Sequence, residues 1–161
     1  MTDRHRRRQH GKMARKRPGD RRAMQPSNAF GSFGECIKAF ADHVLQDAGA
    51  APTIAISPLV WTIEDGCDMR SWNFCVASAG IAGGFRLDGF RCRNDRDLAE
   101  RSRIAMMTEF AGRGPMVLHE FDDELRFAEF CEAMWPCERT TRIRTDVERE
   151  RAEDPRIGQP G

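Results

Sequence analysis

Apolar and polar residues follow one another along this chain with two different periods, and each period predicts one kind of element. Apolar residues spaced by three and four positions mark a helix with one buried side, whereas strict alternation marks a strand. The segment ECIKAFADHVLQDA, residues 35–48, has the helical spacing, and Gly49 is a natural stop after it. We therefore predict a helix over 35–48.

The first strand is predicted to be interrupted by a proline. TIAIS at 53–57 and LVWTI at 59–63 are both rich in β-branched and aromatic residues. Large apolar side chains lie at even numbers in the first run and at odd numbers in the second. Because proline cannot donate a hydrogen bond to a neighbouring strand, we expect a break or bulge at Ser57–Pro58, or an edge position in the sheet.

Two further strands are predicted to form a hairpin. Residues 72–79 are largely apolar at both parities, which favours a central strand. The glycine-rich segment that follows lacks the lysine and the glycine spacing of phosphate-binding loops, so we interpret it as the hairpin loop. Residues 85–92 return as a strand whose apolar parity changes at Asp88–Gly89. We attribute the change to a β-bulge, because a tight Asp-Gly turn would leave very short arms.

Two more helices are predicted in the second half of the chain. Residues 94–114 have the clearest helical pattern, with Asn94 as the expected N-cap. A short strand, MVLHE, separates this helix from a second one at 123–135. Asp122 is the expected N-cap of the second helix, and Pro136 ends it.

This order of elements predicts the α+β class. The order is α-β-β-β-α-β-α, and we expect one small domain with a mostly antiparallel sheet and helices packed on one face. The predicted parts are a disordered basic arm and linker at 1–34, the α+β core at 35–137 and a charged tail at 138–161. The capping box TDVE predicts a short helix in the tail, docked by Ile143 and Val147.

Charge is divided unevenly along the chain, although the total is only +1. Residues 1–26 hold ten basic and two acidic groups, a net charge of +8. Residues 27–161 hold sixteen basic and twenty-three acidic groups, a net charge of −7. Such a split is more informative than the total. Within the body, helix-spaced groups such as Glu100 and Arg103 are expected to form ion pairs.

The basic arm is the strongest functional signal. Each Lys or Arg that reaches a phosphate releases a counterion, so such an arm binds DNA or RNA without reading its sequence. Two other interpretations stay open: the arm folds back on the acidic body, or residues 1–23 are a leader absent from the native protein, since Met13 and Met24 are alternative starts. The predicted nucleic-acid-binding residues are Arg6, Arg7, Arg8, Lys12, Arg15, Lys16, Arg17, Arg21 and Arg22.

The composition argues against several classes of protein. No run of eighteen apolar residues exists, so we expect no membrane span. The basic start is not followed by the apolar segment of a secretory signal. Arg outnumbers Lys twenty-three to three, which indicates the coding bias of a GC-rich genome. We expect a cytoplasmic bacterial protein.

The six cysteines have no Cys-x-x-Cys spacing. Structural zinc sites usually take cysteines in close pairs, whereas several of these have the apolar neighbours of reduced, buried thiols. We predict structural thiols, no metal ion and no cofactor, with a disulfide or a metal site as alternatives. The cysteines are Cys36, Cys67, Cys75, Cys92, Cys131 and Cys137.

Polar side chains gather at HEFDDE, between a strand and a helix. His119 has the chemistry of a general base or metal ligand, with Glu120, Asp122 or Asp123 beside it. The simpler interpretation is that the carboxylates cap the helix and His119 is an ordinary residue at the end of a strand.

Other candidate groups are weaker. Cys36 and His43 lie two helical turns apart, about 10 Å along the axis, which is too far for a hydrogen bond. Trp61, Trp72 and Trp135 have rings that stack on bases, but their apolar neighbours favour core positions.

We predict a small non-enzymatic protein whose body mediates a protein contact and whose arm binds nucleic acid without sequence specificity. One alternative is a ligand-binding domain or enzyme with a site near His119. Another is an effector that presents the acidic helix 123–135, with Glu129 and Glu132, to a basic partner. We identify no family resemblance and no helix-turn-helix, zinc-finger or RNA-recognition motif.

Overall fold

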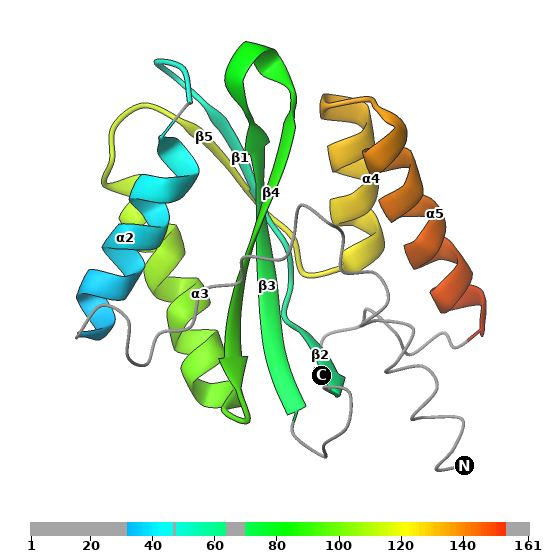
Figure 1. The fold of residues 1–161 in the computed structure, drawn as a ribbon, viewed down its shortest axis with the longest axis horizontal. Coiled ribbons are helices and arrows are strands. Elements are labelled where there is room, and N and C mark those ends of the chain that lie inside the picture. The colour runs from blue at the N-terminus through cyan, green and yellow to red at the C-terminus, as the bar shows by residue number, and fades with distance from the viewer. Residues whose placement is uncertain (1–31, 47, 64–69, 154–161) are drawn as a thin grey trace.

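The protein folds as one small α+β domain in which four helices pack against a five-stranded, mostly antiparallel sheet (Figure 1). This computed structural model describes residues 32–46, 48–63 and 70–153. The elements are α2 (Phe33–Leu45), β1 (Thr53–Ile56), β2 (Val60–Ile63), β3 (Arg70–Ala79), η2 (Ile81–Gly83), β4 (Phe85–Arg93), α3 (Arg96–Ala111), β5 (Val117–Glu120), α4 (Glu124–Met134) and α5 (Glu138–Glu153). The predicted class and order of elements are confirmed.

Strand β3 is the centre of the sheet, as its apolar residues at both parities predicted. Antiparallel β4 pairs along one edge of β3. Antiparallel β1 and β2 share the other edge, and parallel β5 lies beyond β1. The predicted break at Ser57–Pro58 is confirmed, since it divides the first predicted strand into β1 and β2. β1 has neighbours on both sides, whereas β2 has one among the described strands.

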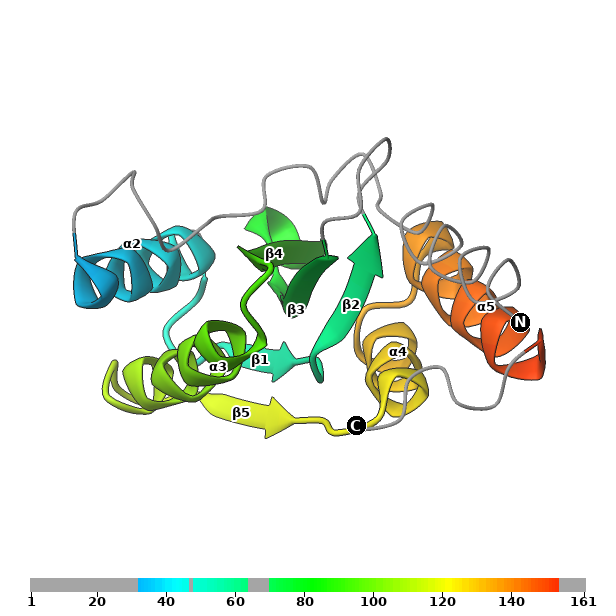
Figure 2. The same cartoon turned by 90° about the horizontal axis from the view of Figure 1, so that it is seen from below.

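Helices cover both faces of the sheet, so the prediction that they pack on one face is wrong. Figure 2 shows α2 and α3 on one side of the strands and α4 and α5 on the other. Neighbouring residues of β1 serve the two layers: Ile54 and Ile56 pack with α2 and α3, and Ala55 packs with α4 and α5. Because successive side chains of a strand point to opposite faces, apolar residues at both parities require a cover on each face.

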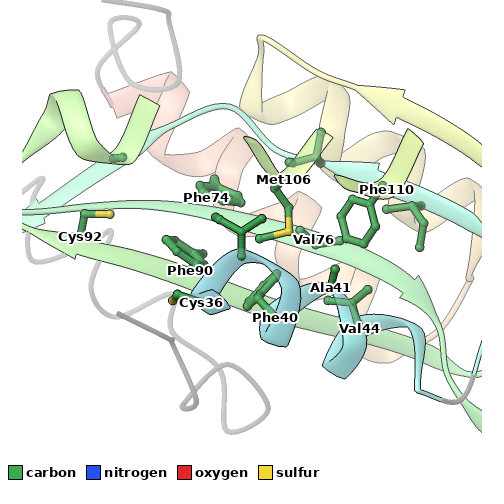
Figure 3. Packing of buried hydrophobic residues seen from close by; sticks show 14 residues of the cluster. Cys36, Phe40, Ala41, Val44, Phe74, Val76, Phe90, Cys92, Met106 and Phe110 are labelled. Atoms are coloured by element: carbon green, nitrogen blue, oxygen red, sulfur yellow. The ribbon is translucent and has the colours of Figure 1, made fainter. Parts of the chain in front are cut away.

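The larger core lies between the sheet and the α2–α3 layer (Figure 3). Phe90 stacks on Phe74 with ring centroids 5.2 Å apart and meets the edge of Phe40 at 5.3 Å. All three rings are at most 1% exposed. Burying each of them stabilises the fold by about 2–3 kcal/mol, so this cluster dominates the packing.

Strand β4 is continuous, and the predicted β-bulge at Asp88–Gly89 is absent. Every residue from Phe85 to Arg93 has a partner on β3 in one unbroken register. The apolar parity changes because Leu87 packs toward α4 and α5, whereas Phe90 packs toward α2 and α3. The change of apolar parity along β4 therefore reflects which face of the sheet each end of the strand buries, and it requires no β-bulge.

Two helix caps lie one residue later than predicted. Asp95, not Asn94, caps α3 by accepting a hydrogen bond from the Leu98 amide, and Asn94 occupies the turn with a φ of 54°. Asp123, not Asp122, caps α4 in the same way. In each helix the capping carboxylate accepts a hydrogen bond from the amide three residues later. Each helix therefore begins one residue later than predicted.

Helix α5 begins at Glu138, seven residues before the predicted capping box. Thr145 lies inside the helix, where its hydroxyl donates to the Thr141 carbonyl. Ile143 and Val147 are buried in the core that α4 also lines, as expected. No helix in the described part of the chain is long and apolar enough to cross a bilayer.

Candidate functional site

A groove of about 420 Å³ opens beside the point where the chain passes from β1 to β2. Its volume falls within the range of about 300–1,000 Å³ typical of ligand sites. Most of its walls are apolar, and charged groups stand at its rim. The lining residues of this tryptophan groove are Pro58, Leu59, Trp61, Trp72, Arg96, Glu100, Arg103, Ile104, Met107, Glu120, Phe121 and Asp122.

Two tryptophans form one wall. Trp61 and Trp72 face each other across β2 and β3, with ring centroids 6.2 Å apart, and both are half-buried. The guanidinium of Arg70 lies 4.4 Å from the Trp61 ring, and that of Arg96 lies 5.0 Å from the Trp72 ring. The expected core position is confirmed for Trp135, which is 7% exposed, but not for these two.

The break between β1 and β2 sets the shape of the groove. The Ser57 amide donates to the Cys75 carbonyl at 2.9 Å, as in a regular ladder. The Cys75 amide instead donates to the Ser57 hydroxyl at 2.8 Å. The Ser57 carbonyl is thereby released from the ladder and accepts from the guanidinium of Arg103 at 2.7 Å.

Arg103 clamps three segments together beneath the groove. Besides the Ser57 carbonyl, it donates to the Phe121 carbonyl at 2.9 Å and to Oε2 of Glu120 at 3.0 Å. Its side chain is only 14% exposed. The predicted ion pair between Arg103 and Glu100 is wrong. The guanidinium donates instead to acceptors on two other segments, because its planar array of N–H groups can meet several acceptors at once.

The charged groups around the groove are mostly paired, and Asp122 is the exception. Glu100 pairs with Arg96 at 3.1 Å, and Glu120 pairs with Arg103. Asp122 is exposed and forms no ion pair with any residue that the structure describes. Three carboxylates and two guanidinium groups line the groove, and the guanidinium of Arg70 lies beside them on Trp61. Asp122 is therefore the lining carboxylate without an ion pair.

Ile104 stands exposed at the mouth of the groove. It is 59% exposed, the largest value among the exposed large apolar side chains of the described chain. The buried stripe of α3 runs through Ala99, Ser102, Met106 and Phe110, and Ile104 lies off that stripe. An isoleucine off the buried stripe is the sequence signal that would have pointed to this surface.

His119 does not join the carboxylates beside it in the sequence. Its ring packs against Phe130 at 4.5 Å, on the α4 side of the sheet. Glu120, the next residue of β5, lines the groove on the α3 side. Because neighbouring residues of a strand point to opposite faces, the predicted cluster is divided by the sheet itself.

The acidic pair at the start of α4 is also divided. Asp122 lines the groove, whereas Asp123 caps the helix and binds Arg151 of α5. Burial alone would raise the pKa of Asp123, but hydrogen bonds from Arg151 and from the Arg126 amide lower it. Asp123 therefore serves the fold, and Asp122 is the group left for a ligand.

The acidic helix proposed as an effector surface uses much of its charge internally. Glu132 binds Arg144 of α5, whose hydrogen bond lowers the pKa of the glutamate. Glu124 is 4% exposed. Glu129 remains exposed. The helix consequently presents less free acid than its sequence indicates.

A histidine–carboxylate pair that the sequence did not predict joins α2 to β4. Nε2 of His43 lies 2.9 Å from Asp88, which also accepts from Arg86 at 3.1 Å. Arg86 donates in turn to the His43 carbonyl at 2.6 Å. The pair holds the C-terminal end of α2 against the sheet, and no local pattern predicts it because the two residues are 45 positions apart in the sequence.

Of the five cysteines that the structure describes, three are buried as expected, Cys75 is half-buried and Cys137 is exposed, whereas Cys67 lies outside the described residues. Burial raises the pKa of Cys36, and it raises the pKa of Cys92 to about 11. Cys131 is also buried and its pKa is raised. Cys137 is exposed just before α5; burial raises its pKa, but hydrogen bonds with Thr140 and Arg139 together lower the pKa below its usual value.

The nine basic residues predicted to bind nucleic acid lie outside the described residues. The site that the structure brings together is instead the tryptophan groove, assembled from the β1–β2 break, α3 and the segment after β5. The chain matches no family model, no curated protein and no solved structure.

Proposed function

We propose that the protein binds nucleic acid through its basic N-terminal arm, while the folded body holds a protein partner. The observation that carries the proposal is the division of charge, with a net +8 on residues 1–26 and a net −7 on the rest of the chain. A phosphate backbone is attracted to the first part and repelled by the second, so its contacts are confined to the arm.

The chemistry of the groove supports this division of labour. The exposed carboxylate of Asp122 has no ion pair with a described residue, and it opposes a polyanion in the groove. His119 packs on a ring, and Asp123 caps a helix, so two groups that the sequence offered for catalysis have structural contacts instead. The groove is thus suited to a ligand other than nucleic acid.

The test compares the full chain with a variant in which the nine arm residues are replaced by glutamine. Fluorescence anisotropy follows binding to labelled single-stranded and duplex DNA of unrelated sequences at low and high salt. A matched control replaces two exposed arginines of α5, Arg142 and Arg149, by glutamine.

We expect the full chain and the α5 control to bind every DNA similarly at low salt. Binding should weaken steeply with salt and disappear in the arm variant. If the arm variant binds as tightly as the full chain, or if the full chain fails to bind at low salt, the proposal is overturned.

A further inference from the structure

We propose that the tryptophan groove binds an extended peptide segment of a partner protein. The segment adds as a strand to the outer edge of β2, with which no described strand pairs, places apolar side chains in the groove and extends a Lys or Arg to Asp122. This inference rests on the part of the proposed function that gives the body a protein partner.

The pairing of the described strands leaves the outer edge of β2 without a strand neighbour among them. β4 occupies one edge of β3 along residues 71–79, so β1 and β2 must share the other edge. β5 pairs with β1, and this pairing ends at the 3.1 Å hydrogen bond that the Phe121 amide donates to the Ile56 carbonyl. Beyond that point no described strand pairs with the outer edge of β2. The main-chain groups of such an edge bind an added strand.

The groove lies beside this edge. Trp61 comes from β2, and Phe121 and Asp122 directly follow β5. The groove therefore lies just past the C-terminal end of β5, beside β2. In an added strand every second side chain points to the α3 side of the sheet. Those side chains enter the groove, which Leu59 and Met107 help to line, whereas the others point away from it.

Apolar surface at the mouth of the groove favours such a ligand. Ile104 is 59% exposed and stands next to the half-buried tryptophans. Contiguous apolar surface framed by polar groups is typical of a protein-binding site. A peptide that covers Ile104 removes this surface from water.

Charge selects a cationic peptide over an anionic one. Asp122 has no ion pair with a described residue, and the side chains of Glu100 and Glu120 remain 49% and 54% exposed despite their pairs. A Lys or Arg on the peptide neutralises Asp122, whereas a phosphate or an acidic side chain is repelled. A basic, alternating peptide is therefore the ligand that fits both the edge and the rim.

The experiment selects ligands from random twelve-residue peptides displayed on phage, with the full chain as bait. Recovered peptides are synthesised, and their affinities are measured by anisotropy for the full chain and its variants. We expect recovered sequences that alternate apolar and polar residues and contain Lys or Arg. Ile104→Glu and Asp122→Lys should each weaken binding about tenfold, as for central residues of an interface. Met134→Glu is the matched control, since Met134 is exposed on α4 and does not line the groove.

Methylation of single peptide nitrogens tests the strand geometry. Methyl groups on amides that face β2 should abolish binding, and those on the alternate amides should leave it unchanged. The proposal is overturned if no peptide is recovered, if Ile104→Glu binds as tightly as the full chain, or if methylation has the same effect at every position.

The arm variant separates this proposal from the nucleic-acid proposal. With its nine residues replaced by glutamine, the chain should lose DNA and keep the selected peptides. If the full chain fails to bind DNA but peptide binding shows the expected pattern, only the role of the arm is overturned. If DNA binds as expected and the peptide results fail, only the groove proposal is overturned.

Discussion

Replacing Arg103 by methionine should destabilise the protein far more than its place on a surface helix suggests. Methionine keeps the apolar stem of the side chain but removes three hydrogen bonds that join the β1–β2 break, β5 and the segment after it. Ser57 is 3% exposed, so its carbonyl is left without a partner and without water.

The magnitude follows from the three bonds. Leaving a buried acceptor unpaired costs about 1–3 kcal/mol, and a hydrogen bond from a charged donor to the Phe121 carbonyl contributes about 1.5 kcal/mol. The bond to Glu120 adds little, about 0–1 kcal/mol, because that carboxylate is 54% exposed. We expect Arg103→Met to lower the free energy of unfolding by about 3 kcal/mol, and the melting temperature by about 6–12 °C.

Urea denaturation followed by far-ultraviolet circular dichroism measures this change. Arg101→Met is the matched control, because Arg101 lies two residues away on α3 and forms an exposed ion pair with Asp97. Its loss should cost less than about 1 kcal/mol. Arg103→Lys should fall between the two variants, since a single ammonium group cannot meet all three acceptors. Equal urea midpoints for Arg103→Met and Arg101→Met would refute the stabilising role of the three Arg103 hydrogen bonds.

Three further outcomes are expected. Asp88→Asn should lower the unfolding free energy by about 1–2 kcal/mol in thermal melts, because it weakens the contacts with His43 and Arg86, and an unchanged melting temperature contradicts this. Cys137 should be alkylated by iodoacetamide before the buried thiols, because it is exposed and its pKa is lowered, and peptide mapping that finds a buried thiol modified first speaks against it. Asp123→Ala should cost about 1 kcal/mol at neutral pH. Because folding lowers the pKa of Asp123, its contribution to the free energy of unfolding is fully present above the unfolded pKa of about 3.9 and is lost as pH falls through the folded pKa. The stability difference between the wild-type protein and Asp123→Ala should therefore shrink in acid. A difference that grows in acid would exclude this role.

The hydrophobic periodicity of the sequence predicted the helices and strands well. It failed where a strand buries side chains on both faces of the sheet. The helices, the central place of β3 and the break at Ser57–Pro58 follow from periodicity and from the chemistry of proline. The bulge in β4 and the single helical layer were both wrong for one reason. A strand covered on both faces shows apolar residues at changing parity without any slip in register, as Leu87 and Phe90 do.

Ile104 off the buried stripe of α3 marks the surface, but the assembly of the tryptophan groove could not be predicted from the sequence. Arg103 binds the carbonyl of a residue 46 positions away and that of another 18 positions away. No periodicity records contacts at such separations, which depend on how β1, β5 and α3 meet. Even the adjacent residues His119 and Glu120 proved misleading, since the sheet sends them to opposite sides.

The most direct test of the proposed function is the salt dependence of DNA binding. For B-DNA the logarithm of the binding constant falls with the logarithm of salt concentration with a slope of about −0.9 for each phosphate neutralised. If most of the nine arm residues reach phosphates, the full chain should show a slope between about −5 and −8, and the glutamine variant a slope near zero. A shallow slope that is the same for both proteins would contradict a nucleic-acid-binding arm.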